Sequence, residues 1–76
     1  MKSIFNIGDF VQTPRGFYMV ENIEIVDGEA TVYLSGKEEI DDCRMLASEL
    51  EKAIIRHVRH RDGRAAVNFF ELAFAK

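Results

Sequence analysis

Apolar and polar side chains alternate along the first half of the chain, as they do in antiparallel strands. Residues 10–13 are mostly β-branched or aromatic, which favours a strand. Pro14 cannot donate to a strand ladder and Gly16 adopts positive φ easily, so these two residues predict a turn. The apolar segment 17–26 then returns as the second strand of a hairpin.

The second strand contains an irregularity and ends in a strong turn signal. Strict period two fails at Glu21-Asn22, which predicts a bulge or a bend. Asp27-Gly28 is typical of a type I′ hairpin turn, in which both central residues need positive φ. Residues 31–34 follow as a third strand, so a three-stranded meander is expected.

From residue 43 the hydrophobic period changes. Ser48 and Glu51 have the spacing of a capping box, and apolar residues then recur at the spacing of one helix face, which predicts a helix over residues 49–60. A rival interpretation divides this region into a fourth strand at 43–47, one turn of 3₁₀ helix at 48–52 and a fifth strand at 54–58.

A second helical pattern occupies residues 64–75, after Asp62-Gly63 interrupts the chain. Its apolar positions fall at i, i+3, i+4, i+7 and i+8 and form one amphipathic stripe. The stripe consists of Ala66, Phe69, Phe70, Ala73 and Phe74. It is the most hydrophobic surface that the sequence predicts. Its phenylalanines are most simply core that caps the open side of the sheet, and the alternative is an excess that stays exposed for a partner or for self-association.

These patterns predict a single α+β domain over residues 1–76, with a β-meander at 1–36 and a mainly helical part at 48–76. The first half resembles the opening of small SH3-like barrels, including KOW-type modules. The residues that carry this resemblance are Gly8-Asp9-Phe10-Val11-Gln12-Thr13-Pro14-Arg15-Gly16, then Val20, Ile23 and Val32-Tyr33-Leu34. The resemblance implies a small, bent antiparallel sheet or partial barrel, and it implies little about function.

Composition narrows the class of protein. With 76 residues, 47% of them hydrophobic and 30% charged, the chain suits one folded domain of modest stability. Cys43 is the single cysteine, so no disulfide within the chain is possible and a reducing compartment is favoured. No run of twenty apolar residues is present, so we expect a cytoplasmic protein without a membrane partner.

Charge is distributed unevenly around a net value of −3. Residues 1–50 hold four basic and ten acidic side chains, net −6, whereas residues 51–76 hold six basic and three acidic ones, net +3. Four of the acidic side chains crowd residues 37–42, but the glycine and terminal glutamate of an EF-hand loop are missing. Such asymmetry concerns partners rather than fold.

No catalytic or cofactor-binding motif is evident. His57 and His60 share one face of the predicted helix but lack further ligands at a zinc-site spacing, so solvated surface histidines are expected. Cys43 is distant from both in sequence, and the glycines are isolated turn residues rather than a phosphate-binding loop. We therefore expect no enzyme, no metal, no cofactor and no small-molecule substrate.

The remaining hypothesis is a non-enzymatic interaction module that binds a protein or associates with itself. Its candidate partner-binding residues are Arg56, Arg59, Arg61, Arg64, Phe69, Phe70 and Phe74. The basic segment 52–64 supports two other interpretations: contact with nucleic acid, or pairing with the acidic half of the same chain or of a second copy. A third function class is an acidic inhibitor of phage or mobile-element origin that occupies a basic site on a larger protein.

Overall fold

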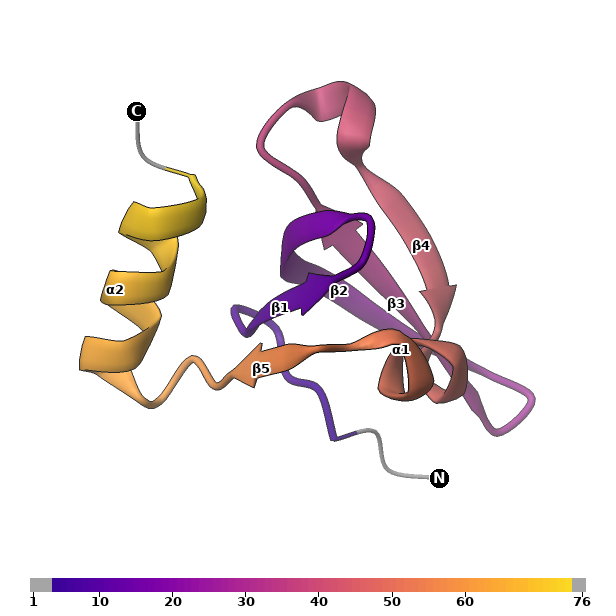
Figure 1. The fold of residues 1–76 in the computed structure, drawn as a ribbon. Coiled ribbons are helices and arrows are strands. Elements are labelled where there is room, and N and C mark those ends of the chain that lie inside the picture. Colours follow the sequence, from indigo (N-terminus) through magenta and orange to yellow (C-terminus); the bar gives the residue numbers. More distant parts are fainter. Residues whose placement is uncertain (1–3, 75–76) are drawn as a thin grey trace.

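The computed structural model of the chain describes residues 4–74. They form an antiparallel five-stranded sheet with two helices, as expected for a small α+β fold with a bent sheet and a C-terminal helix (Figure 1). The elements are β1 (Phe10–Thr13), β2 (Gly16–Val26), β3 (Glu29–Ser35), the 3₁₀ turn η1 (Glu39–Asp41), β4 (Cys43–Leu46), α1 (Ala47–Ala53), β5 (Arg56–Val58) and α2 (Gly63–Ala73). The strand order is β4-β3-β2-β1-β5.

Both predicted turns and the predicted bulge are present. Gly16 has a φ of +145°, and the Thr13 hydroxyl accepts a hydrogen bond of 3.1 Å from the Arg15 N–H. At the next turn Asp27 and Gly28 have φ values of 52° and 80°, as a type I′ turn requires. The β2–β3 register shifts between Val20 and Asn22, so the irregular alternation in β2 does mark a bulge.

The helix predicted over residues 49–60 is wrong beyond Ala53, and the rival interpretation is the closer one. The strand β5 pairs with β1, and the Ile55 N–H donates to the Gln12 carbonyl at 2.7 Å. This ladder satisfies the otherwise open edge of β1, which outweighs the helical spacing of the local apolar residues. The predicted cap at Ser48 is also wrong, because β4 runs directly into α1 and Leu46 occupies the N-cap without a side-chain hydrogen bond.

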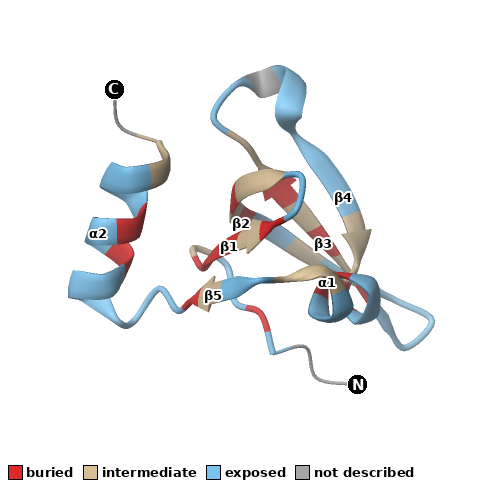
Figure 2. Cartoon of the chain, viewed as in Figure 1, coloured by how far each residue is buried: buried red, intermediate tan, exposed pale blue. Residues whose placement is uncertain are grey.

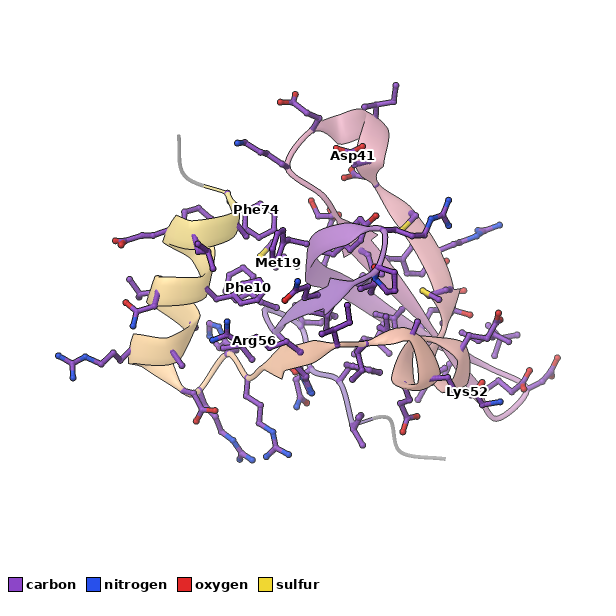
Figure 3. The ribbon with its side chains drawn as sticks, in the orientation of Figure 1. Phe10, Met19, Asp41, Lys52, Arg56 and Phe74 are labelled. Atoms are coloured by element: carbon purple, nitrogen blue, oxygen red, sulfur yellow. The ribbon has the colours of Figure 1, made fainter. Side chains whose placement is uncertain are left out.

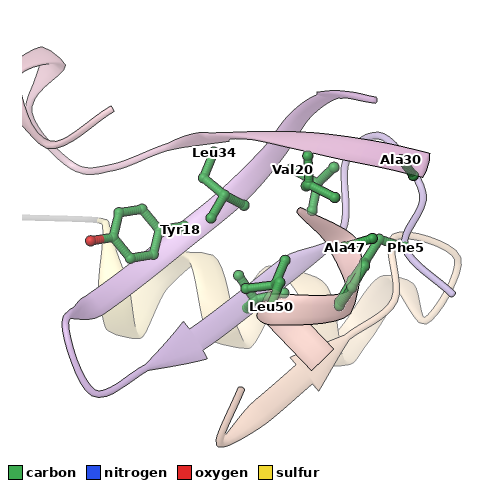
Figure 4. Close-up of a cluster of buried hydrophobic side chains, with 9 residues drawn as sticks. Phe5, Tyr18, Val20, Ala30, Leu34, Ala47 and Leu50 are labelled. Carbon is green, nitrogen blue, oxygen red and sulfur yellow. The ribbon is translucent and has the colours of Figure 1, made fainter. Parts of the chain in front are cut away.

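The inner face of the bent sheet encloses the larger hydrophobic core (Figure 4). Val11, Val20 and Val32 come from three neighbouring strands and are fully buried, while Leu50 of α1 packs among them. The whole buried cluster is Phe5, Val11, Tyr18, Val20, Ala30, Val32, Leu34, Ala47 and Leu50. The helix α1 therefore covers this core where β4 gives way to β5.

A second, smaller core lies on the outer face of the sheet, under α2. Phe10 points to this face because its neighbour Val11 points inward, and its ring stacks on that of Phe69 at 5.5 Å. Ala66 and Phe69 are the buried residues of α2, so the predicted amphipathic stripe faces the sheet. Figure 2 shows this buried stripe and the exposed outer side of α2. The predicted C-terminal end of the helix, Ala75, lies outside the described residues.

The outer core predicts unequal effects of two adjacent phenylalanines on stability. Phe69 is 1% exposed and Phe70 is 48% exposed. Phe69→Ala should lower the free energy of unfolding by about 3–5 kcal/mol, because it leaves a cavity between α2 and β1. Phe70→Ala is the matched control and should cost less than half as much. Urea denaturation followed by circular dichroism measures both, and equal losses would contradict this packing.

Candidate functional site

The structure divides the predicted partner-binding residues into two groups. Phe69 is buried, and Arg56 is exposed but packs its guanidinium 5.4 Å from the centre of the Phe69 ring, so both contribute to the packing of α2. The others stay accessible around the β5–α2 connection and on α2. These are the exposed residues Arg59, Arg61, Arg64 and Phe70 and the partly buried Phe74.

The accessible residues continue along one side of α2. Arg64, Val67 and Phe70 follow one another at i, i+3 and i+6, so each side chain neighbours the next on the helix surface. Val67 is 57% exposed and Phe70 is 48% exposed. We call the set Arg59, Arg61, Arg64, Val67 and Phe70 the α2 face. Val67 was not among the residues predicted from the sequence, because it lies beside the apolar stripe rather than within it.

A shallow apolar cleft borders the α2 face. Phe70 stacks on Phe74 with ring centroids 5.6 Å apart, and both rings lie near Phe10. Figure 3 shows Phe74 and Phe10 beside Met19, where α2 meets the sheet. The cleft has a volume of about 150 Å³ and is lined by Phe10, Met19, Ser35, Gly36, Phe70 and Phe74. The predicted excess of aromatic surface on this helix is therefore only partly covered by the sheet.

The arginines of the α2 face carry unneutralised charge. Among the described residues the one ion pair joins Asp9 to His57, so no carboxylate there lies within 4.0 Å of a guanidinium nitrogen of Arg59, Arg61 or Arg64. Exposed guanidinium groups beside exposed apolar side chains suit an anionic partner that also carries apolar groups. That combination defines the chemistry of this surface.

The other notable polar group is a buried carboxylate that fastens β5 to the start of the sheet. Asp9 is 1% exposed. One of its carboxylate oxygens lies 2.8 Å from His57 Nε2 and accepts from the Asn6 N–H at 2.9 Å. Its second oxygen accepts from the His60 N–H at 2.8 Å. All of these partners are structural, and they leave the carboxylate no free role toward a ligand.

Hydrogen bonds, rather than burial, decide the protonation state of Asp9. Burial alone would raise the pKa of its carboxyl group. The hydrogen bonds from the His60 N–H, the His57 ring and the Asn6 N–H outweigh burial and hold this pKa below the ordinary value of 3.8. Asp9 is therefore a charged acceptor inside the fold at neutral pH.

The expectation that both histidines are solvated on one helix face is wrong for His57. Its side chain is 13% exposed, its ring lies 5.0 Å from that of Phe5, and it bonds to Asp9. The pair is separated by 48 positions in sequence. No local sequence pattern predicts the Asp9–His57 pair, because the pair forms only when β5 is a strand beside β1. His60 contributes its backbone N–H to Asp9, and its side chain is exposed.

Cys43 shows no sign of activation. Burial raises the pKa of its thiol and Asp42 adds to this effect, while Arg15 opposes both. Among residues 4–74, no hydrogen bond joins the thiol to either histidine, and no group of three or more His, Cys, Asp or Glu side chains has a metal-binding arrangement. The α2 face is thus the better candidate for a functional surface.

Comparison with known proteins adds no assignment: no family model, curated protein or solved structure matches the chain. Within the described part of the chain, no helix is long and apolar enough to cross a membrane.

The buried carboxylate predicts a loss of stability in acid. The fold lowers the pKa of Asp9, so its charged carboxylate adds to the free energy of unfolding. This contribution is complete above the pKa of Asp9 in the unfolded chain, near the ordinary value of 3.8. It is lost as the pH falls through the pKa of Asp9 in the folded state. Asp9→Asn should lower the free energy of unfolding at pH 7 by about 2–4 kcal/mol.

The measurement is urea denaturation of both proteins from pH 7 down to about pH 2.5. The difference in stability between wild type and Asp9→Asn should shrink below about pH 4. A difference that stays constant across this range would show that the charge of Asp9 is not what stabilises the fold.

Proposed function

We propose that the chain is a non-enzymatic protein-binding module whose α2 face receives an acidic segment with apolar side chains. The observation that carries this proposal is the exposure of Phe70 and Val67 on α2, together with Arg64 in its first turn and Arg59 and Arg61 in the connection before it, none of which forms an ion pair among the described residues. Aromatic and arginine side chains are enriched where interfaces gain most of their binding energy. The bent sheet then acts as a rigid support for one helix.

A charge-reversed variant tests this proposal. Arg61→Glu/Arg64→Glu changes two exposed residues of the α2 face. The change at Arg64 also suits the first turn of α2, where the helix dipole favours an acidic side chain. The variant should therefore fold normally and lose partners that bind the wild type. Affinity capture from a lysate of the source cell, quantified by mass spectrometry, measures the loss.

A matched control has the same change in net charge elsewhere. Lys37→Glu/Arg44→Glu also replaces two exposed basic residues, in the β3–η1 connection and in β4. It should retain the partners that Arg61→Glu/Arg64→Glu loses. If both variants capture the same proteins as the wild type, the α2 face is not the binding surface.

Nucleic acid is a second candidate ligand, favoured by the same exposed arginines. Phosphate contacts release counterions, so such binding weakens steeply as salt concentration rises. Gel-shift titration at about 50 and 200 mM salt tests this function. Binding that is salt-sensitive and lost in Arg61→Glu/Arg64→Glu would favour it over protein binding, and absence of any shift would exclude it.

A further inference from the structure

The exposed charges of the two charged regions do not pair with each other among the described residues. The distal half of the β2–β3 hairpin exposes four acidic residues, namely Glu21, Glu24, Asp27 and Glu29. None of them forms an ion pair with any described residue, and neither do the arginines of the α2 face. Pairing of the basic segment with the acidic half of its own chain, one of the predicted alternatives, is therefore limited among the described residues to the buried contact of His57 with Asp9.

Geometry explains why the two regions stay apart. The molecule measures 39 × 27 × 19 Å along its principal axes. Figure 1 shows α2 on one side of the sheet and the turn of the β2–β3 hairpin at the opposite end. One chain cannot bring its own hairpin tip to its own α2 without dismantling the sheet. Two chains can do so without any change of fold.

The hairpin tip has the chemistry that the α2 face accepts. Ile25 and Val26, directly before the Asp27-Gly28 turn, are 61% and 52% exposed. The tip thus combines apolar side chains with carboxylates, whereas the α2 face combines Val67 and Phe70 with arginines. Apolar contact and opposite charge would act together if the two surfaces met.

We propose that the chain assembles head to tail, with the β2–β3 hairpin tip of one copy bound to the α2 face of the next. This inference rests on the proposed function, because it names a second copy of the chain as the partner of that face. The contact joins two different surfaces, so a pair of copies still offers a free hairpin at one end and a free α2 face at the other. The average size of the assemblies therefore grows with chain concentration.

A symmetric dimer through two α2 faces is the less favourable alternative. It would bury Phe70 against its own copy, but it would also bring the arginines of both copies together, and in each copy these three arginines outnumber the exposed carboxylates near them in sequence, Asp62 and Glu71. Like charges across an interface are costly. The head-to-tail arrangement instead places arginines against Glu24, Asp27 and Glu29 of the hairpin.

The expected contact is small, because a hairpin tip covers only part of a helix face. Interfaces at the low end of the size range are weak, and contacts between exposed charges are screened by salt. Sedimentation velocity should therefore show a mass average that rises with chain concentration at about 50 mM salt. The apparent association constant should be at least about tenfold lower at about 500 mM salt.

Two variants, each disabled at one end, provide the decisive experiment. Ile25→Thr/Val26→Thr removes the apolar tip and keeps β-branched residues in the strand, while Arg61→Glu/Arg64→Glu reverses the charge of the α2 face. Each variant alone should be monomeric where the wild type associates. Their equimolar mixture should form a dimer and nothing larger, because only one intact hairpin and one intact α2 face remain to meet.

Other outcomes contradict the assembly. A wild-type chain that stays monomeric up to about 1 mM at low salt overturns it. Association of Ile25→Thr/Val26→Thr as strong as that of the wild type also overturns it, because this result indicates pairing of α2 with α2. Lys37→Glu/Arg44→Glu is the charge-matched control and should associate normally. If the chain is monomeric but still captures partners through the α2 face, only this inference is refuted. If Arg61→Glu/Arg64→Glu behaves as the wild type in both sedimentation and affinity capture, the proposed function is refuted as well.

Discussion

The fold depends on β1 having an apolar side chain on each of its two faces. Val11 points into the barrel-like core, while Phe10 points to the outer face. β1 also pairs with β2 on one side and with β5 on the other, so its backbone is satisfied only when β5 is in place. A sheet with two apolar faces needs two covers, and α1 and α2 provide them. The stacking of Phe10 on Phe69 is the contact that joins the second cover to the sheet.

The same requirement explains why part of the apolar surface of α2 stays exposed. The sheet buries Ala66 and Phe69 of α2 but leaves Phe70 half exposed above the cleft beside Met19. Exposed arginines precede and begin α2, and the β5–α2 connection that carries two of them is anchored through the His60 N–H on Asp9. The side of α2 that serves folding and the side that we propose for binding are thus adjacent on a single helix.

Local signals predicted the hairpins and α2 well, and the central segment poorly. The turn at Asp27-Gly28, the bulge after Val20 and the stripe containing Phe69 each follow from residues close in sequence. The strand β5 cannot be predicted from residues close in sequence, because its pairing with β1 overrides the helical spacing of its apolar residues. The Asp9–His57 pair could not be predicted either, because it forms only when β5 is a strand. A core role for the phenylalanines of α2 was predicted, but which of them is buried depends on how α2 lies against Phe10. The resemblance to SH3-like barrels stays a prediction.

Native-state hydrogen exchange tests most directly whether α2 is part of one cooperative core or an accessory that opens alone. The central amides of α2, at Phe69 and Phe70, and the β1 amide of Val11 are the residues to compare. If docking on Phe10 completes the fold, the α2 amides should exchange with the same free energy and the same urea dependence as the β1 amide. Exchange of α2 through a local opening, with low free energy and little urea dependence while β1 stays protected, would contradict this account.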